Sequence, residues 1–245
     1  MSISMRGAFD DAHDDRQLLE SRFGDHGAFT PAADGVVGQD RVMAFLSVRE
    51  ALSETHTDIE EIDREMGSFE ELAEGEEPPM REALPAIFSM TKSMMGLPWV
   101  FGEIERTRNR ALLDSEMGLG EYSYIYVLAY HDELITPTED ANLFSASAVN
   151  QRVRADLRDM IERQLAVARL DADANEDLVA ALGAEVQALE ADHQRILWQD
   201  GLPEQIEASF TDFRDRLDAT YSAAAAEFDL LNSSVGNGGL SITMK

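Results

Sequence analysis

Apolar side chains recur every three or four residues along most of the chain, which is the spacing of one face of an α-helix. The most regular stripe lies in residues 203–231: Ile206, Phe210, Phe213, Leu217, Tyr221, Ala224, Phe228 and Leu231. At a rise of 1.5 Å per residue, one helix over this range would be about 44 Å long. The pattern therefore predicts a long, continuous last helix.

Two other regions show long stripes of the same kind. The first predicted helix runs from about Asp40 to Met66, with Val42, Phe45, Leu52, Ile59, Ile62 and Met66 on one face. Helices over residues 149–170 and 178–196 are joined by a short polar turn, which predicts an antiparallel hairpin. Shorter helices are predicted over residues 85–96 and 98–117. Long helices with narrow apolar stripes favour lengthwise packing in a bundle.

The segment from Tyr122 to Tyr130 has no clear period, because nearly all of its residues are apolar or aromatic. Tyrosine, isoleucine and valine favour strands. No other segment of the predicted body resembles a strand, and a lone strand would leave its backbone groups without partners. We therefore expect a central, buried helix here.

Together these elements predict an all-α fold, an antiparallel bundle of about six helices over residues 39–231. Residues 1–38 contain Asp clusters and glycines without sustained periodicity, so we expect a mostly disordered acidic segment. Residues 232–245 are rich in Ser and Gly, and we expect a flexible C-terminal tail there.

The charge of the chain narrows its possible partners. It has 48 acidic and 20 basic residues, a formal net charge of -28 at pH 7, and Lys92 and Lys245 are its only lysines. Nucleic-acid binding requires a basic footprint, which this chain lacks, and anionic membrane surfaces are disfavoured for the same reason. Scarce lysine and abundant acid fit either a halophilic source or an ordinary acidic protein from a GC-rich genome.

Cysteine content and the N-terminal sequence bear on the compartment. The chain has no cysteine, which excludes disulfides, thiolate catalysis and Cys-based zinc sites. Residues 1–15 lack the apolar region of a signal peptide, and no apolar run approaches the roughly 20 residues that span a bilayer. We expect a cytoplasmic protein without a membrane span; a secreted chain whose signal has been removed is the alternative.

A metal site is the first chemical possibility, since helical bundles build metal sites from facing side chains. Glu190 and His193 form a Glu-x-x-His pair, and His56 continues the apolar stripe of the first predicted helix. His56, Glu190 and His193 could together bind a divalent metal if their helices meet. The alternative is two hydrogen-bonded histidines at the edge of the core and no cofactor.

Three groups of residues could bind a partner or ligand. Met90, Met94 and Met95 could line an adaptable groove, although such methionines usually fill core gaps. Arg106 and Arg110 share a helix face and could hold an anionic group, or could pair with nearby acids. Tyr122 and Tyr126 complete the candidates for partner or ligand binding.

No motif for nucleophilic catalysis or phosphate binding is present. The leading hypothesis is a non-catalytic bundle with an interaction or scaffolding role, through a protein partner or self-association. The alternatives are a ferritin-like metal enzyme and a carrier that holds an apolar ligand between its helices.

Overall fold

The structure is a computed structural model that describes residues 2–74, 102–135, 151–170, 176–192 and 195–231. Within these ranges the regular elements are all helical, so the predicted all-α bundle is confirmed. They number more than the predicted six, mainly because the last predicted helix is broken. The predicted helix over residues 85–96 and the C-terminal tail lie outside the described residues.

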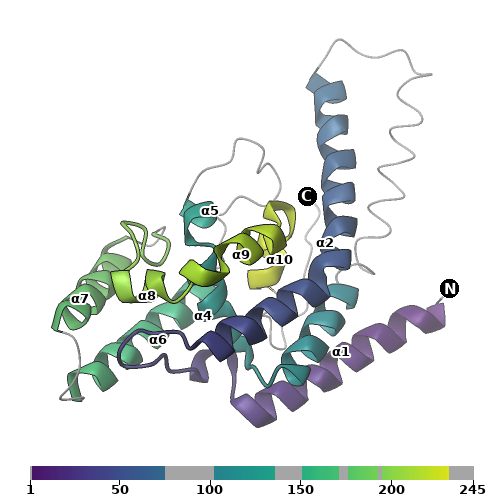
Figure 1. Cartoon of the computed structure of the whole chain (residues 1–245). Helices are drawn as coiled ribbons and strands as arrows, with labels where there is room; N and C mark the ends of the chain where they lie inside the picture. The colour runs from purple at the N-terminus through teal and green to yellow at the C-terminus, as the bar shows by residue number, and fades with distance from the viewer. Residues whose placement is uncertain (1, 75–101, 136–150, 171–175, 193–194, 232–245) are drawn as a thin grey trace.

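The predicted central helix is confirmed as α4 (Leu119–Ala129). Every described residue in it except Glu121 is buried, and the helix lies between α1, α2, α5 (His131–Ile135) and the short 3-10 helix η1 (His26–Ala28). Figure 1 shows α4 at the centre of the body. A helix that is apolar on all sides is stable only in such a surrounded position, which explains why its sequence lacks a clear period.

α2 (Gln39–Glu74) carries the first predicted stripe and is longer than expected. Val42, Phe45, Leu52 and Ile59 of this stripe are buried. The C-terminal part of α2 extends away from the other described helices (Figure 1). The helix ends at Glu74, about two turns later than the predicted end at Met66.

The predicted antiparallel hairpin is formed by α6 (Gln151–Leu170) and α7 (Glu176–Ala191). Arg154, near the start of α6, donates hydrogen bonds to the backbone oxygens of Leu189 and Asp192 at the end of α7. An arginine beside these carbonyls satisfies acceptors that have no partner within the helix. α7 is shorter than predicted.

The loop after α7 is fixed by a buried acid. Glu185 of α7 accepts hydrogen bonds from the backbone nitrogen of Trp198 at 2.8 Å and from Arg195 Nη2 at 2.8 Å. Trp198 has a φ of 59°, and its backbone oxygen accepts a hydrogen bond from His131 Nε2. These contacts join the hairpin to α5.

The prediction of one continuous last helix is wrong. The chain forms α8 (Glu204–Ala208), the 3-10 helix η3 (Thr211–Phe213), α9 (Arg214–Thr220) and α10 (Ala223–Leu231). At Tyr221 the backbone is extended, with a ψ of 137°. Ile206, Phe210 and Leu217 of the stripe are nevertheless buried, and Phe213, Tyr221 and Ala224 are partly buried against the core. The apolar spacing therefore indicated the face that packs on the core, but not a continuous helix.

The N-terminal segment also differs from the expectation of disorder. Residues Ser2–Phe23 form α1, in which Ala12 and Leu19 are buried. The helix ends at Gly24, whose φ of 85° and hydrogen bond to the Glu20 oxygen are typical of a left-handed C-terminal cap. α1 has few apolar positions, and its order depends on contacts with the rest of the chain, such as the hydrogen bond from Asn109 to the Ala12 oxygen.

The stretch between α1 and α2 packs closely on α4 and α6. His26 contacts Asp156 Oδ2 and Ser123 Oγ, each at 2.9 Å. A Cβ added to Gly120 of α4 would lie 2.1 Å from the His26 backbone oxygen, so only glycine permits this approach. The body of the protein therefore begins before residue 39.

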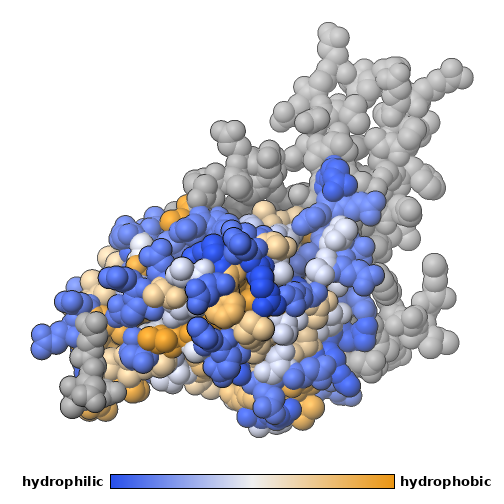
Figure 2. All heavy atoms as spheres, viewed as in Figure 1, coloured by the Kyte–Doolittle hydropathy of each residue, from blue (hydrophilic) through white to orange (hydrophobic). Residues whose placement is uncertain are grey.

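The outer surface agrees with the acidic composition. Figure 2 shows hydrophilic residues over much of the visible face of the described body, with apolar residues scattered among them. In the described ranges, no helix has the length and apolarity that crossing a bilayer requires.

Candidate functional site: a buried polar cluster around Arg49

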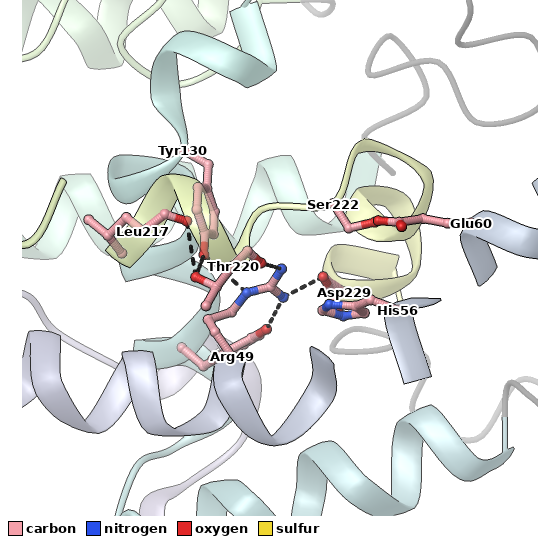
Figure 3. Close-up of polar contacts among 9 residues, drawn as sticks. Arg49, His56, Glu60, Tyr130, Leu217, Thr220, Ser222 and Asp229 are labelled. Carbon is pink, nitrogen blue, oxygen red and sulfur yellow. Dashed lines mark hydrogen bonds and ion pairs between the residues drawn. The ribbon is translucent and has the colours of Figure 1, made fainter. Parts of the chain in front are cut away.

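Arg49 of α2 is fully buried and is the centre of a polar cluster (Figure 3). Its Nη1 donates to Tyr122 Oη at 3.0 Å and to Asp229 Oδ2 of α10. Its Nε donates to Tyr130 Oη at 3.2 Å, and its Nη2 donates to the Thr220 backbone oxygen at 2.9 Å. One guanidinium thus connects α2, α4, the residue that follows α4, and the ends of α9 and α10.

Asp229 is the counter-charge to Arg49 and is also fully buried. Its second oxygen, Oδ1, lies 3.2 Å from His56 Nε2 (Figure 3). Burial alone would raise the pKa of Asp229, but Arg49 and His56 outweigh it and lower the pKa below its ordinary value. Asp229 is therefore an ionised carboxylate inside the bundle, with both oxygens in use.

Aromatic rings enclose the guanidinium. The Arg49 Cζ lies 5.0 Å from the Tyr126 ring centroid and 5.2 Å from that of Tyr130. Phe45 packs on Tyr122 at a centroid distance of 5.3 Å. Such rings stabilise a cation that has lost its water, because their faces carry partial negative charge. Burial raises the pKa of both Tyr122 and Tyr126, so their hydroxyls stay protonated.

The break between α9 and α10 supplies part of the cluster. Because the chain leaves the helical conformation at Tyr221, the Thr220 oxygen is free to accept from Arg49. Tyr130 Oη and Thr220 Oγ1 are 2.9 Å apart. Ser222 Oγ donates to Glu60 Oε1 at 2.8 Å, a second connection to α2 (Figure 3).

The arrangement holds helices together rather than presenting a reactive group. A general base must reach a substrate proton with a free lone pair. Both oxygens of Asp229 already have partners inside the protein, and the carboxylate is closed off from solvent. Within the described cluster, Arg49 and Asp229 therefore act as an internal ion pair.

Of the three predicted metal ligands, the structure describes His56 and Glu190, and it does not bring these two together. His56 lies beside Asp229, whereas Glu190 is exposed on α7, which lies at the opposite side of the body from the second half of α2 (Figure 1). His193 is outside the described residues. Among the residues that the structure describes, no group of three or more His, Asp or Glu side chains could hold a metal.

The described residues among those predicted to bind a partner or ligand lie in different surroundings and do not form one site. Tyr122 and Tyr126 are core residues of the cluster, which fits close packing better than an apolar cavity. Arg106 pairs with Glu103 on its own helix, and Arg110 lies 3.8 Å from Asp15 of α1. Met90, Met94 and Met95 fall outside the described residues, so the predicted groove stays a prediction.

Sequence reasoning missed Arg49 and Asp229, although one signal was available. Arg49 and His56 occupy the same helical stripe as Val42, Phe45, Leu52 and Ile59. A charged residue on an apolar stripe must find a buried partner, because an isolated charge in the core is very costly. The stripe could have identified Arg49, but not its partner 180 residues later.

No family model, curated protein or solved structure matches the chain. The candidate site therefore rests on the geometry alone.

Proposed function

We propose that the protein is a non-catalytic helical bundle that works by binding a protein partner or a second copy of itself. The observation that carries this proposal is the form of α2. This helix is anchored in the core as far as Ile59, and the exposed Glu60 accepts a hydrogen bond from Ser222. The C-terminal part of the helix then continues to Glu74 away from the other described helices (Figure 1). A helix is stable mainly through packing of its apolar face, so a long extension suits a role in contact with another chain.

The sequence of the extension supports this role. Ile62, Met66 and Phe69 follow Ile59 at helical spacing, although their side chains are outside what the structure describes. The net charge of -28 favours a partner with a basic or neutral surface and disfavours nucleic acid. Cytoplasm is the compartment we infer for such a cysteine-free chain.

The experiment compares the intact chain with a variant that carries Ile62→Asp and Met66→Asp. Light scattering after size exclusion gives the mass at several concentrations, and tagged protein captures partners from native extract at native salt. The control carries Ser53→Asp and Thr57→Asp, two exposed positions on the same helix. We expect the first variant to lose the dimer or the captured partner, and the control to keep it.

A monomer at every concentration, with no protein captured differently by the two variants, would contradict the proposal. Metal analysis of protein purified without chelator tests the ferritin-like alternative. A stoichiometric transition metal would favour the enzyme over the interaction role.

A further inference from the structure

A second buried arginine, Arg108, differs from every other arginine described in the core. It lies in the helix of residues 102–114, and its side chain is fully buried. In the described part of the chain, its Nε, Nη1 and Nη2 atoms have no hydrogen-bond partner. A guanidinium has five N–H donors, and leaving them unpaired inside a protein is very unfavourable.

The neighbouring carboxylates are already used. Glu105 lies 3.6 Å from Arg16, and Asp229 accepts from Arg49 and contacts His56. Both acids attract Arg108 electrostatically, but burial outweighs them and lowers the pKa of Arg108. The protein thus encloses a cation and supplies it with no hydrogen-bonded counter-charge from the described residues.

This arrangement is unexpected in so acidic a chain. With 48 acidic residues for 20 basic ones, a carboxylate partner is easily available, and Arg41 and Arg195 illustrate the usual result. Arg41 contacts both oxygens of Glu121 at 2.6 and 2.7 Å, and Arg195 contacts both oxygens of Glu185 at 3.3 and 2.8 Å. Arg108 alone among the fully buried described arginines lacks such a partner.

We propose that Arg108 binds a small oxyanion, the carboxylate or phosphate group of a ligand, inside the bundle. The planar guanidinium presents pairs of N–H groups that match two oxygens of either group. Arg49, the other fully buried arginine of the described core, has its own carboxylate partner in Asp229, so the missing partner is particular to Arg108.

The test measures binding by the full chain through its melting temperature and by calorimetry. The probes are inorganic phosphate and acetate, titrated at constant ionic strength against chloride. Arg108→Met removes the site, and Arg108→Lys keeps the charge without the paired donors. Arg110→Met is the matched control, because Arg110 lies on the same helix and is mostly exposed, with 68% of its side chain accessible.

We expect a saturable rise in the melting temperature of the wild type and of Arg110→Met with at least one probe. Arg108→Met should show no rise, and Arg108→Lys should bind at least tenfold more weakly. A response to phosphate alone would assign a phosphorylated ligand, and a response to acetate would assign a carboxylate. If neither probe produces a saturable response in the wild type, or if Arg108→Met responds like the wild type, the proposal is overturned. Should Arg108→Met fail to fold, calorimetry on the wild type and Arg108→Lys decides the question.

Discussion

Arg49 on α2 and Asp229 on α10 form an ion pair that has no access to solvent, although 180 residues separate them in the chain. The pair ties α10 to α2, and α2 also packs on the Tyr-rich α4. A buried pair is costly to form but even more costly to break, since the remaining charge has no water to stabilise it. The stability of the fold should therefore depend strongly on either partner.

Replacing Asp229 with Ala should lower the free energy of unfolding by about 3 to 5 kcal/mol, because Arg49 would be left buried without its counter-charge. Urea denaturation in concentrated salt measures this change. Asp218→Ala is the control, since Asp218 is exposed on the neighbouring α9, and we expect it to leave the stability essentially unchanged. Equal effects of the two substitutions would contradict the buried pairing.

Acid should weaken the protein through the same carboxylate. The pKa of Asp229 is lowered in the folded state by Arg49 and His56 against the effect of burial, so its stabilising contribution is present above the unfolded pKa of about 4. That contribution is lost as the pH falls through the lower, folded pKa. We expect the stability difference between wild type and Asp229→Asn to shrink as the pH falls from about 6 to about 2.5. A difference that does not change with pH would argue against an ionised Asp229.

The five tyrosines should resist ionisation in the folded protein. Burial raises the pKa of Tyr122, Tyr124, Tyr126 and Tyr130, and it raises the pKa of Tyr221 to about 12. Since unfolded tyrosines ionise near pH 10, stability should fall as the pH rises above that value. Ultraviolet titration should show phenolate only together with loss of helical circular dichroism. Phenolate that forms near pH 10 while the helices persist would contradict this result.

Gly120→Ala should destabilise the protein by about 2 kcal/mol or more, because the new Cβ would lie 2.1 Å from the His26 backbone oxygen. Thermal and urea unfolding measure the change. Gly183→Ala is the matched control: Gly183 lies within α7 and a Cβ there would meet no atom within 4 Å. We expect this second variant to be more stable by about 0.5 to 1 kcal/mol. If Gly120→Ala is as stable as the wild type, residues 24–38 do not pack on α4 as described.

Helical spacing predicted the elements well wherever a local stripe coincided with the buried face, as in α2 and α6. It could not predict the interruption at Tyr221, because the hydrogen bond that the Thr220 oxygen accepts at this break comes from Arg49, a residue far away in the chain. Helical spacing also failed to predict α1. This helix has few apolar residues, and its order depends on contacts such as the hydrogen bond from Asn109 to the Ala12 oxygen. Local propensity and periodicity report one segment at a time, whereas these features arise from long-range contacts.

The candidate site, the polar cluster around Arg49, likewise depends on long-range contacts that local patterns do not report. The stripe of α2 placed His56 toward the core and could have placed Arg49 there too, but no local pattern identifies Asp229 as their common partner. The predicted metal set joined His56 to Glu190 and His193 because the last two form a Glu-x-x-His pair and His56 continues an apolar stripe. Local spacing and residue type do not determine which helices face each other, and α7 packs on α6.

A double-mutant cycle between Arg49 and Asp229 tests most directly whether α10 closes the bundle on α2. Arg49→Met, Asp229→Leu and the double variant are compared with the wild type by urea unfolding. We expect a coupling energy of about 2 to 3 kcal/mol, with the double variant more stable than either single variant. Additive effects, with a coupling energy below about 0.5 kcal/mol, would show that the two residues do not meet.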